Sequence, residues 1–314
     1  MSLTNGKITF LERNYLFGLG LIKKLETGSS LGYAQRLFGE TADNEIFELE
    51  NTAGSDSDAP ATPWGYTASL LRGGLVVEFY KAVSIDTIIL RDASINFVTI
   101  SIRVDSPISG AIPDAVGNNG QTYTVNSVNK SVDGVSEVVY QIEIFQNSNP
   151  DSVPSVIKLP KVFDNIIGIE LNMWVSSLTT PIKIGAIVFT NEIGEFAGYP
   201  EISGLNYSLN EKASKNLVGE YDIVKQKKTI RPFNINFRGY SHLADIELCQ
   251  QLLERYAPFN LNIAGGKDQM RYPILGLGPL DLILVQTRGE LKSRLRKGSY
   301  NGLIDAQLKL VPAI

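Results

Sequence analysis

The sequence predicts a mainly β protein with two domains, a β-sandwich or jelly roll followed by a smaller α+β domain in which one helix packs on an antiparallel sheet. The length of 314 residues is about twice the commonest length of a single domain. From residue 70 to residue 190, apolar and polar residues alternate between clusters of Gly, Pro, Asn and Ser, which is typical of sandwich strands. After about residue 200 this pattern changes, and one segment has a helical period.

The first predicted domain covers residues 1–198 and begins with an N-terminal strand or arm. Its strands are predicted where apolar residues alternate or β-branched residues cluster: residues 7–11, 16–25, 75–80, 85–90, 98–104, 135–145, 166–174 and 182–189. Residues 39–62 are polar and predict a long loop, and such loops in compact domains are usually functional or loosely ordered. A short segment from Tyr33 to Phe38 is the only helical candidate before residue 240.

The second predicted domain covers residues 199–314 and follows a linker from Gly194 to Pro200. Its strands are predicted at residues 205–209, 229–238, 259–263, 282–287 and 303–311. Apolar residues recur at steps of three and four between Leu243 and Tyr256, which predicts a helix there. Ser241 is its expected N-cap, and Pro258 is expected to stop it.

The net charge of −4 combines two halves of opposite sign. Residues 1–200 carry 13 Lys and Arg against 22 Asp and Glu, whereas residues 201–314 carry 16 against 11. Opposite signs fit two domains that attract each other or copies that stack head to tail, and they equally fit ordinary variation of solvated surfaces. No apolar run approaches the roughly 20 residues of a membrane-spanning helix, so no membrane partner is expected.

Few residues could support catalysis, so we expect no enzyme, no cofactor and no metal site. A single cysteine excludes an intramolecular disulfide framework, and a single histidine excludes metal sites that need two imidazoles. His242 is the only candidate base for a nucleophile, but its place in the first turn of the predicted helix favours a partly exposed turn residue. Cys249 lies on the apolar stripe of that helix and is predicted to pack in the core.

The acidic residues in and near the long loop leave three interpretations open. Asp56 and Asp58, or Glu48 and Glu50, could form the carboxylate pair of a glycoside hydrolase. The loop acids could also bind calcium, but no regular ligand spacing such as an EF-hand supports this. Solvated loop acids are the favoured interpretation.

A basic cluster between two predicted strands is the candidate assembly interface. It consists of Arg288, Lys292, Arg294, Arg296 and Lys297 and is expected on a long hairpin. The cluster could be solvated, contact an acidic neighbouring subunit, or bind nucleic acid. Nucleic acid is the least favoured partner, because no aromatic residues interleave with the basic ones for base stacking.

Five segments of the first domain follow one another in a familiar order. They are GYAQRLFGE, APATPW with a Thr-x-Trp signature, LVVEFYKAVSIDTIILRD, FVTISIRVDS and NIIGIELNMWVSSLTTPIKIGAIVF. In this order, residues 31 to 190 resemble the discoidin, or coagulation-factor-type C, family of galactose-binding-like β-sandwiches. The long acidic loop stands where that family usually has Asp-Gly, and residues 106–135 look like an insertion.

The discoidin resemblance implies binding of sugars or lipids through loops at one end of the sandwich. The candidate ligand-binding residues are then Asp56, Asp58, Trp64 and Tyr66, with host-surface glycans as the expected ligand. Trp64 could stack on a sugar ring, although in this family the tryptophan is more often packed beneath the loops.

The second domain contains RPFNINFRGY, a helix, APFNLNI, a glycine turn, a strand, a basic hairpin and a terminal LIDAQLKLVPA. This succession, from about residue 203 to 314, resembles phage tail-tube and tail-terminator-like modules. Arg294 to Lys297 stand where such modules often have a hairpin rich in glycine and proline.

Together the two resemblances imply a distal-tail-like protein of a phage tail tip or baseplate. We expect a structural role, in which the second domain forms a homo-oligomeric ring and contacts neighbouring tail proteins. The sandwich would serve docking or host attachment. The expected location is the tail of the virion, assembled in the host cytoplasm. The alternatives are a free carbohydrate-binding adhesin and, less favoured, a glycoside hydrolase.

Overall fold

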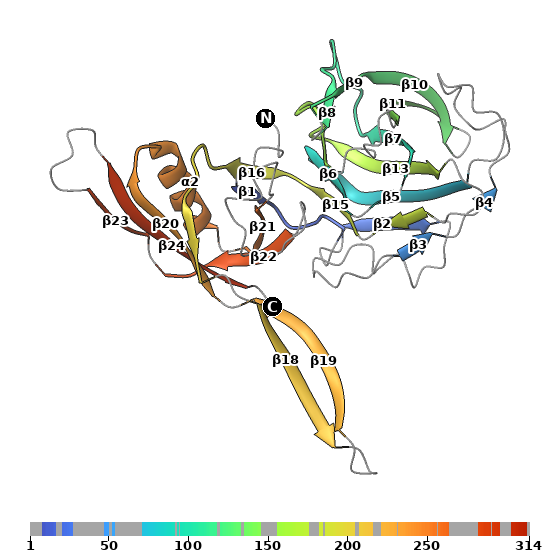
Figure 1. Cartoon of the computed structure of the whole chain (residues 1–314). Coiled ribbons are helices and arrows are strands. Elements are labelled where there is room, and N and C mark those ends of the chain that lie inside the picture. Colours follow the sequence, from blue (N-terminus) through green and yellow to red (C-terminus); the bar gives the residue numbers. More distant parts are fainter. Residues whose placement is uncertain are drawn as a thin grey trace. The chain divides into compact units, whose positions relative to one another are not determined.

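The protein is mainly β, as predicted, and its single described helix packs on an antiparallel sheet (Figure 1). The computed structural model describes residues 8–16, 21–27, 47–49, 52–53, 71–91, 93, 95–117, 120–132, 135–145, 156–175, 182–184, 186–204, 207–215, 221–230, 232–255, 257–263, 282–289, 291–295 and 303–312. These residues divide into two compact units. Unit 1 holds the described residues from 14 to 192, and unit 2 holds residues 8–13 and those from 193 to 312.

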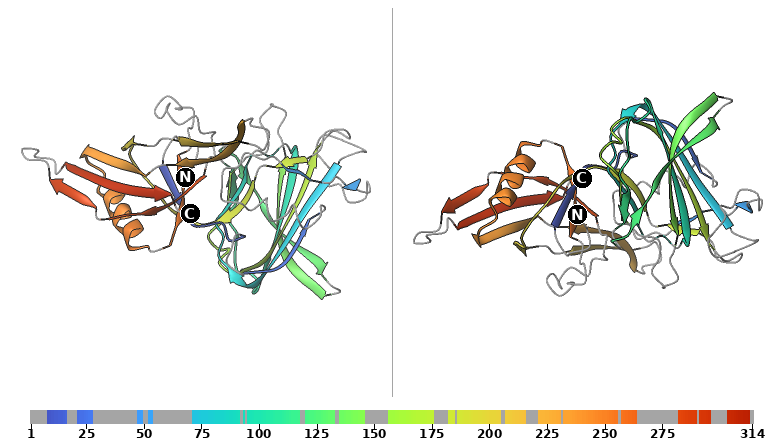
Figure 2. Two further views of the ribbon diagram at one scale, coloured as in Figure 1. Left: turned by 90° about the horizontal axis from the view of Figure 1, so that it is seen from below. Right: turned by 90° about the horizontal axis from the view of Figure 1, so that it is seen from above.

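Unit 1 is a β-sandwich. Its strands are β2 (Ile22–Thr27), β3 (Phe47–Leu49), β4 (Thr52–Ala53), β5 (Leu71–Val83), β6 (Thr87–Arg91), β7 (Phe97–Val104), β8 (Ala115–Gly117), β9 (Thr122–Tyr123), β10 (Val125–Val132), β11 (Val135–Phe145), β12 (Val156–Lys158), β13 (Ile166–Val175), β14 (Ile182–Ile184) and β15 (Ala186–Thr190). One sheet has the order β10-β11-β7-β13-β5-β2, with β4 beside β5, and the other has the order β15-β6-β12-β8-β9. Figure 2 shows these two sheets face to face.

The predicted alternation places the core between the two sheets of unit 1. On β7, for example, Val98, Ile100 and Ile102 are fully buried in the core cluster. Residues 106–135, which look like an insertion relative to the resembled family, supply β8, β9 and β10. Residues 28–46, which include the helical candidate near Tyr33, lie outside the described residues.

Unit 2 is an antiparallel sheet with a helix on one face (Figure 2). Its elements are β1 (Ile8–Leu11), β16 (Glu192–Glu195), which starts one residue before the unit does, β17 (Glu201–Ser203), β18 (Tyr207–Lys215), β19 (Tyr221–Ile230), β20 (Phe233–Tyr240), α2 (Leu243–Glu254), β21 (Phe259–Ile263), β22 (Leu282–Thr287), β23 (Lys292–Leu295) and β24 (Ile304–Pro312). The sheet order is β16-β1-β21-β22-β24-β20-β17, with β23 beside β24. Helix residues such as Cys249 and Leu252 pack against apolar residues of the sheet.

The N-terminal strand belongs to unit 2, and this changes the domain organisation. The expected division was 1–198 and 199–314, whereas the units divide at 192/193 and residues 8–13 join the second one. All four residues of β1 are buried, and the strand lies between β16 and β21. Unit 1 is therefore inserted in the sequence between the first and second strands of the unit 2 sheet.

Two local predictions in unit 2 need correction. The N-cap of α2 is His242 rather than Ser241, and its side chain makes no capping hydrogen bond. The strand predicted over residues 229–238 is two strands, because Pro232 separates β19 from β20. No helix among the described residues is long and apolar enough to span a membrane.

Candidate assembly site

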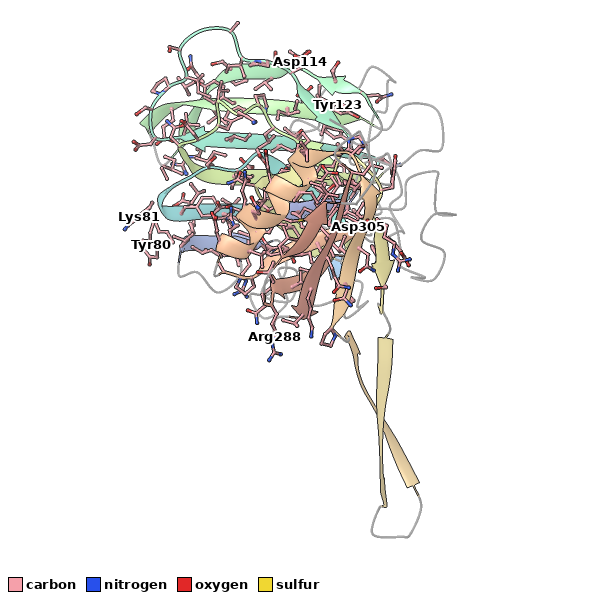
Figure 3. The ribbon with its side chains drawn as sticks, turned by 90° about the vertical axis from the view of Figure 1, so that its left-hand side faces the viewer. Tyr80, Lys81, Asp114, Tyr123, Arg288 and Asp305 are labelled. Atoms are coloured by element: carbon pink, nitrogen blue, oxygen red, sulfur yellow. The ribbon has the colours of Figure 1, made fainter. Side chains whose placement is uncertain are left out.

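The basic cluster predicted as a hairpin lies partly on a strand of unit 2. Lys292 and Arg294 belong to β23, which pairs antiparallel with β24. Arg288 is exposed just after β22, as Figure 3 shows, and its backbone N–H donates to the carbonyl of Lys309 at 3.0 Å. Arg296 and Lys297 lie outside the described residues. The cluster therefore begins on a strand at the edge of the sheet.

Four strands at this side of unit 2 form an array that is open at both ends. The order is β23-β24-β20-β17, and every neighbouring pair is antiparallel. Among the described residues, β23 pairs only with β24, and β17 pairs only with β20. Unpaired strand edges present N–H and C=O groups that can pair with another chain. The array thus offers two such edges.

One row of residues crosses the whole array and has opposite charges at its two ends. Lys292 on β23 pairs with Gln307 on β24, Gln307 pairs with Asn236 on β20, and Asn236 pairs with Glu201 on β17. The Gln307 Nε2 donates to Asn236 Oδ1 at 2.8 Å, and the Asn236 Nδ2 donates to Ser203 Oγ at 2.7 Å. The two amides hold the middle of the row in register, so the edges keep a fixed offset.

The edge at β17 lies close to two exposed apolar side chains. Tyr199 is 40% exposed and Leu243 is 56% exposed. They flank a tight contact, because a Cβ on Gly198 would lie only 2.9 Å from Cδ2 of His242. The two exposed side chains add apolar surface near the open strand.

A buried carboxylate fixes this region. Asp245 is only 2% exposed and accepts hydrogen bonds from the N–H groups of Ala197 at 2.8 Å and Gly198 at 3.0 Å. The Tyr240 hydroxyl donates to the same carboxylate. Asp245 therefore ties the segment before β17 to α2.

A two-stranded arm, defined as β18 and β19, extends the pairing of β17 with β20. Ser203 pairs with Asn234, and Tyr207 pairs with Ile230 in the same register, although β18 and β19 form a separate two-stranded sheet. Among the described residues, β18 and β19 pair only with each other, and Figures 1 and 3 show no third strand beside them. An isolated two-stranded hairpin is at best marginally stable in water. The arm is therefore expected to need contact with another surface for its stability.

Two of the residues considered for catalysis, His242 and Cys249, lie in the part of the chain that the structure describes. His242 is exposed and meets Tyr240 edge-on, with ring centroids 5.4 Å apart. Cys249 is fully buried, as predicted, and burial together with the charge of Asp245 raises the pKa of its thiol to about 12. The thiol is thus protonated at neutral pH and is not a nucleophile. Among the described residues, no group of three or more His, Cys, Asp or Glu could hold a metal ion.

The predicted ligand-binding residues Asp56, Asp58, Trp64 and Tyr66 lie outside the described residues, as does Glu50. Glu48 lies on β3, which pairs with β14. These residues stay predictions.

The described surface of unit 1 carries a ladder of charges across its larger sheet. Arg103 on β7 binds Glu78 on β5 at 2.8 Å and Glu137 on β11 at 2.9 Å, and Lys23 on β2 lies 3.4 Å from Glu78. Arg103 reaches over β13 at Gly168, where a Cβ would lie in ordinary contact with its side chain, at 3.7 Å. Burial would raise the pKa of Glu78, but the hydrogen bonds and charges of Arg103 and Lys23 together outweigh it and lower the pKa. The ladder joins four strands of the sheet.

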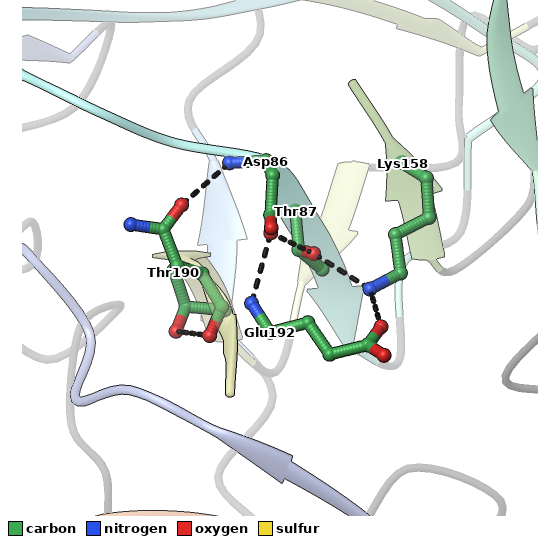
Figure 4. Close-up of polar contacts among 6 residues, drawn as sticks. Asp86, Thr87, Lys158, Thr190 and Glu192 are labelled. Atoms are coloured by element: carbon green, nitrogen blue, oxygen red, sulfur yellow. Dashed lines mark hydrogen bonds and ion pairs between the residues drawn. The ribbon is translucent and has the colours of Figure 1, made fainter. Parts of the chain in front are cut away.

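A second polar network closes the end of the unit 1 sandwich (Figure 4). The Thr87 hydroxyl donates to Asp86 at 2.7 Å and accepts from Lys158 at 2.9 Å, and Lys158 also pairs with Glu192. The Glu192 N–H donates to Asp86 at 2.9 Å. The network fixes the last residue of unit 1 against β6 and β12, so we assign it a structural role.

Substitution of threonine by valine is expected to have opposite effects on stability at two buried positions. Thr9 on β1 is fully buried, and its hydroxyl has no hydrogen-bond partner in the part of the chain that the structure describes. We expect Thr9→Val to raise the free energy of unfolding of unit 2 by about 1 kcal/mol, because it removes an unsatisfied group at constant shape. Thr87→Val breaks two bonds and is expected to cost unit 1 about 1–2 kcal/mol. Urea unfolding of both variants checks the signs, and a destabilised Thr9→Val protein would contradict the account.

The sequence patterns do not predict the full length of the arm or the open edge at β17. The arm segment shows only partial alternation, so the sequence predicts strand at its two ends alone. Comparison of the chain with protein-family models, with curated proteins and with solved structures gives no match.

Proposed function

We propose that the protein is a non-catalytic structural protein that self-assembles through unit 2. The arm is the observation that carries this proposal: strands of nine and ten residues pair only with each other among the described residues. Such a hairpin gains stability when another surface covers it. The open edges at β17 and β23 and the opposite charges of the two sequence halves support the same role.

Within this role, a component of a phage tail tip or baseplate is the particular protein that we propose. The order of strands and helix in the second half of the sequence, which resembles tail-tube-like modules, supports it. Unit 2 would form the homo-oligomeric ring in the virion tail and contact neighbouring tail proteins. Unit 1, a galactose-binding-like sandwich by resemblance, would dock to a neighbour or to host glycans.

The arm can be tested by deletion. Replacing residues 207–230 with a short Gly-Ser turn leaves the pairing of β17 with β20 intact. We expect the variant to be monomeric by light scattering at concentrations where the intact chain assembles, with an unchanged circular dichroism melting curve. A variant that assembles like the intact chain would contradict the role of the arm in assembly, which is the observation that carries the proposal.

Carbohydrate binding by unit 1 is the second candidate function. It is favoured by the insertion of the sandwich as one continuous segment whose ends lie together, since the Tyr15 N–H donates to the Phe189 carbonyl at 2.9 Å. Close termini let a separate module be inserted in another fold without disturbing it. A glycan array with the intact chain and with Trp64→Ala tests this candidate, and absence of binding by the intact chain would exclude it.

A further inference from the structure

We infer that unit 2 joins a second copy of the chain edge to edge, with β17 of one copy paired antiparallel to β23 of the next. The inference rests on the proposed assembly function and names the surfaces that meet. The geometry that carries it is the four-strand array β23-β24-β20-β17, whose two outer strands are open among the described residues.

The strand directions of the array allow this pairing to repeat. Each neighbouring pair is antiparallel and the number of strands is even, so β17 and β23 run in opposite directions. A second copy in the same orientation, placed beside β17, therefore presents its β23 antiparallel to β17. The alternation of strand directions then continues from copy to copy without a parallel pair.

The charges select which edges meet. The row Lys292–Gln307–Asn236–Glu201 ends in a base at β23 and in an acid at β17. The Glu201 side chain is 55% exposed, and its contact with Arg238 is loose at 3.5 Å, so it remains accessible to a neighbour. Pairing β17 with β23 brings Glu201 close to Lys292 and Arg294, whereas pairing like edges opposes equal charges.

The contact that results is heterologous, because two different edges meet. Such a contact closes into a ring if the rotation between copies completes a circle, and otherwise extends into a filament. The exposed side chains of Tyr199 and Leu243 beside β17 supply apolar surface that a neighbouring copy covers. The arm follows β17 in the chain and precedes β20, so it is connected to both strands of the pair at that edge.

Cysteine cross-linking of the full chain tests the pairing. The variant Glu201→Cys/Lys292→Cys carries one new thiol at each edge, and the native Cys249 is buried and protonated at neutral pH. With a short bis-maleimide linker we expect a ladder of covalent dimers, trimers and higher species on a denaturing gel. Each single variant, and the control Glu201→Cys/Lys309→Cys with its second thiol on β24, is expected to stay monomeric on that gel.

Charge reversal adds a readout that does not depend on cross-linking. Glu201→Lys alone, or Lys292→Glu with Arg294→Glu, is expected to weaken assembly by about tenfold or more at low salt, and the triple variant is expected to regain it. A chain that assembles in light scattering but gives no ladder, or dimers from a single-cysteine variant, would overturn the β17–β23 pairing alone. A chain that stays monomeric at every concentration would overturn the proposed function as well.

Discussion

A fragment of residues 193–314 is expected to remain unfolded, and fusion of residues 1–13 to Ile193 through a short flexible linker is expected to restore its fold. The fragment lacks β1, which lies between β16 and β21 in the sheet. Without β1, the strand β16 loses its neighbour and the core of unit 2 is opened. Amide dispersion in NMR spectra and a cooperative thermal transition distinguish the two proteins.

The size of this effect follows from the packing of Phe10. Its ring is fully buried and meets Phe196 at 4.8 Å and Phe259 at 5.8 Å, both edge-on. Truncating one buried phenylalanine to alanine typically costs about 3–5 kcal/mol, against a total stability of about 5–15 kcal/mol for a domain. Loss of the whole strand removes Ile8 and Leu11 as well, so little stability should remain.

The linker that joins residues 1–13 to Ile193 can be short, because β1 and β16 are neighbours in the sheet. In unit 2 the Phe196 N–H donates to the Ile8 carbonyl at 3.0 Å, so the two chain segments that lead to unit 1 lie side by side. Residues 14–192 serve as the control fragment and are expected to fold alone, because Asn14 bonds to the Ile187 carbonyl and the Phe189 N–H. A cooperative transition in residues 193–314 alone would contradict the assignment of β1 to unit 2.

Replacing Asp245 with alanine is expected to lower the free energy of unfolding of unit 2 by about 3–5 kcal/mol. Three donors lose their acceptor in a buried site: the N–H groups of Ala197 and Gly198 and the Tyr240 hydroxyl. The variant should also weaken assembly, because the segment next to β17 is no longer tied to α2. Urea unfolding and light scattering measure the two effects.

Glu247→Ala is the matched control for Asp245. Glu247 is exposed on the same helix, and substitutions at such positions usually change stability by less than about 0.5 kcal/mol. Tyr240→Phe removes only one of the three donors and should cost about 1–2 kcal/mol. A loss below 1 kcal/mol for Asp245→Ala would show that the carboxylate does not hold this segment.

Sequence periodicity predicts the strands whose two faces differ. Phe233, Ile235 and Phe237 alternate with Asn234 and Asn236, and the structure buries the aromatic and aliphatic set under α2. The helix is predicted for the same reason, since its apolar stripe includes Cys249 and Leu252. These predictions succeed because the apolar periodicity that determines each element lies within one short segment of the sequence.

The features that local patterns missed depend on residues far apart in the sequence. The alternation of residues 7–11 predicts the strand β1. Only its pairing with β21, some 250 residues later in the sequence, assigns it to unit 2. The row from Lys292 to Glu201 likewise combines four strands whose order is set by the fold. The arm was missed because its lysines interrupt the apolar alternation, and β17 because three residues are too short for a periodic signal.

Self-assembly through unit 2 is the central claim, and the mass of the intact chain in solution tests it most directly. Multi-angle light scattering over a range of protein concentrations should give a mass that rises to a multiple of 34.4 kDa. The mass should fall back to that of one chain when residues 207–230 are replaced by a short turn. A mass of 34.4 kDa at every concentration for the intact chain would contradict the claim.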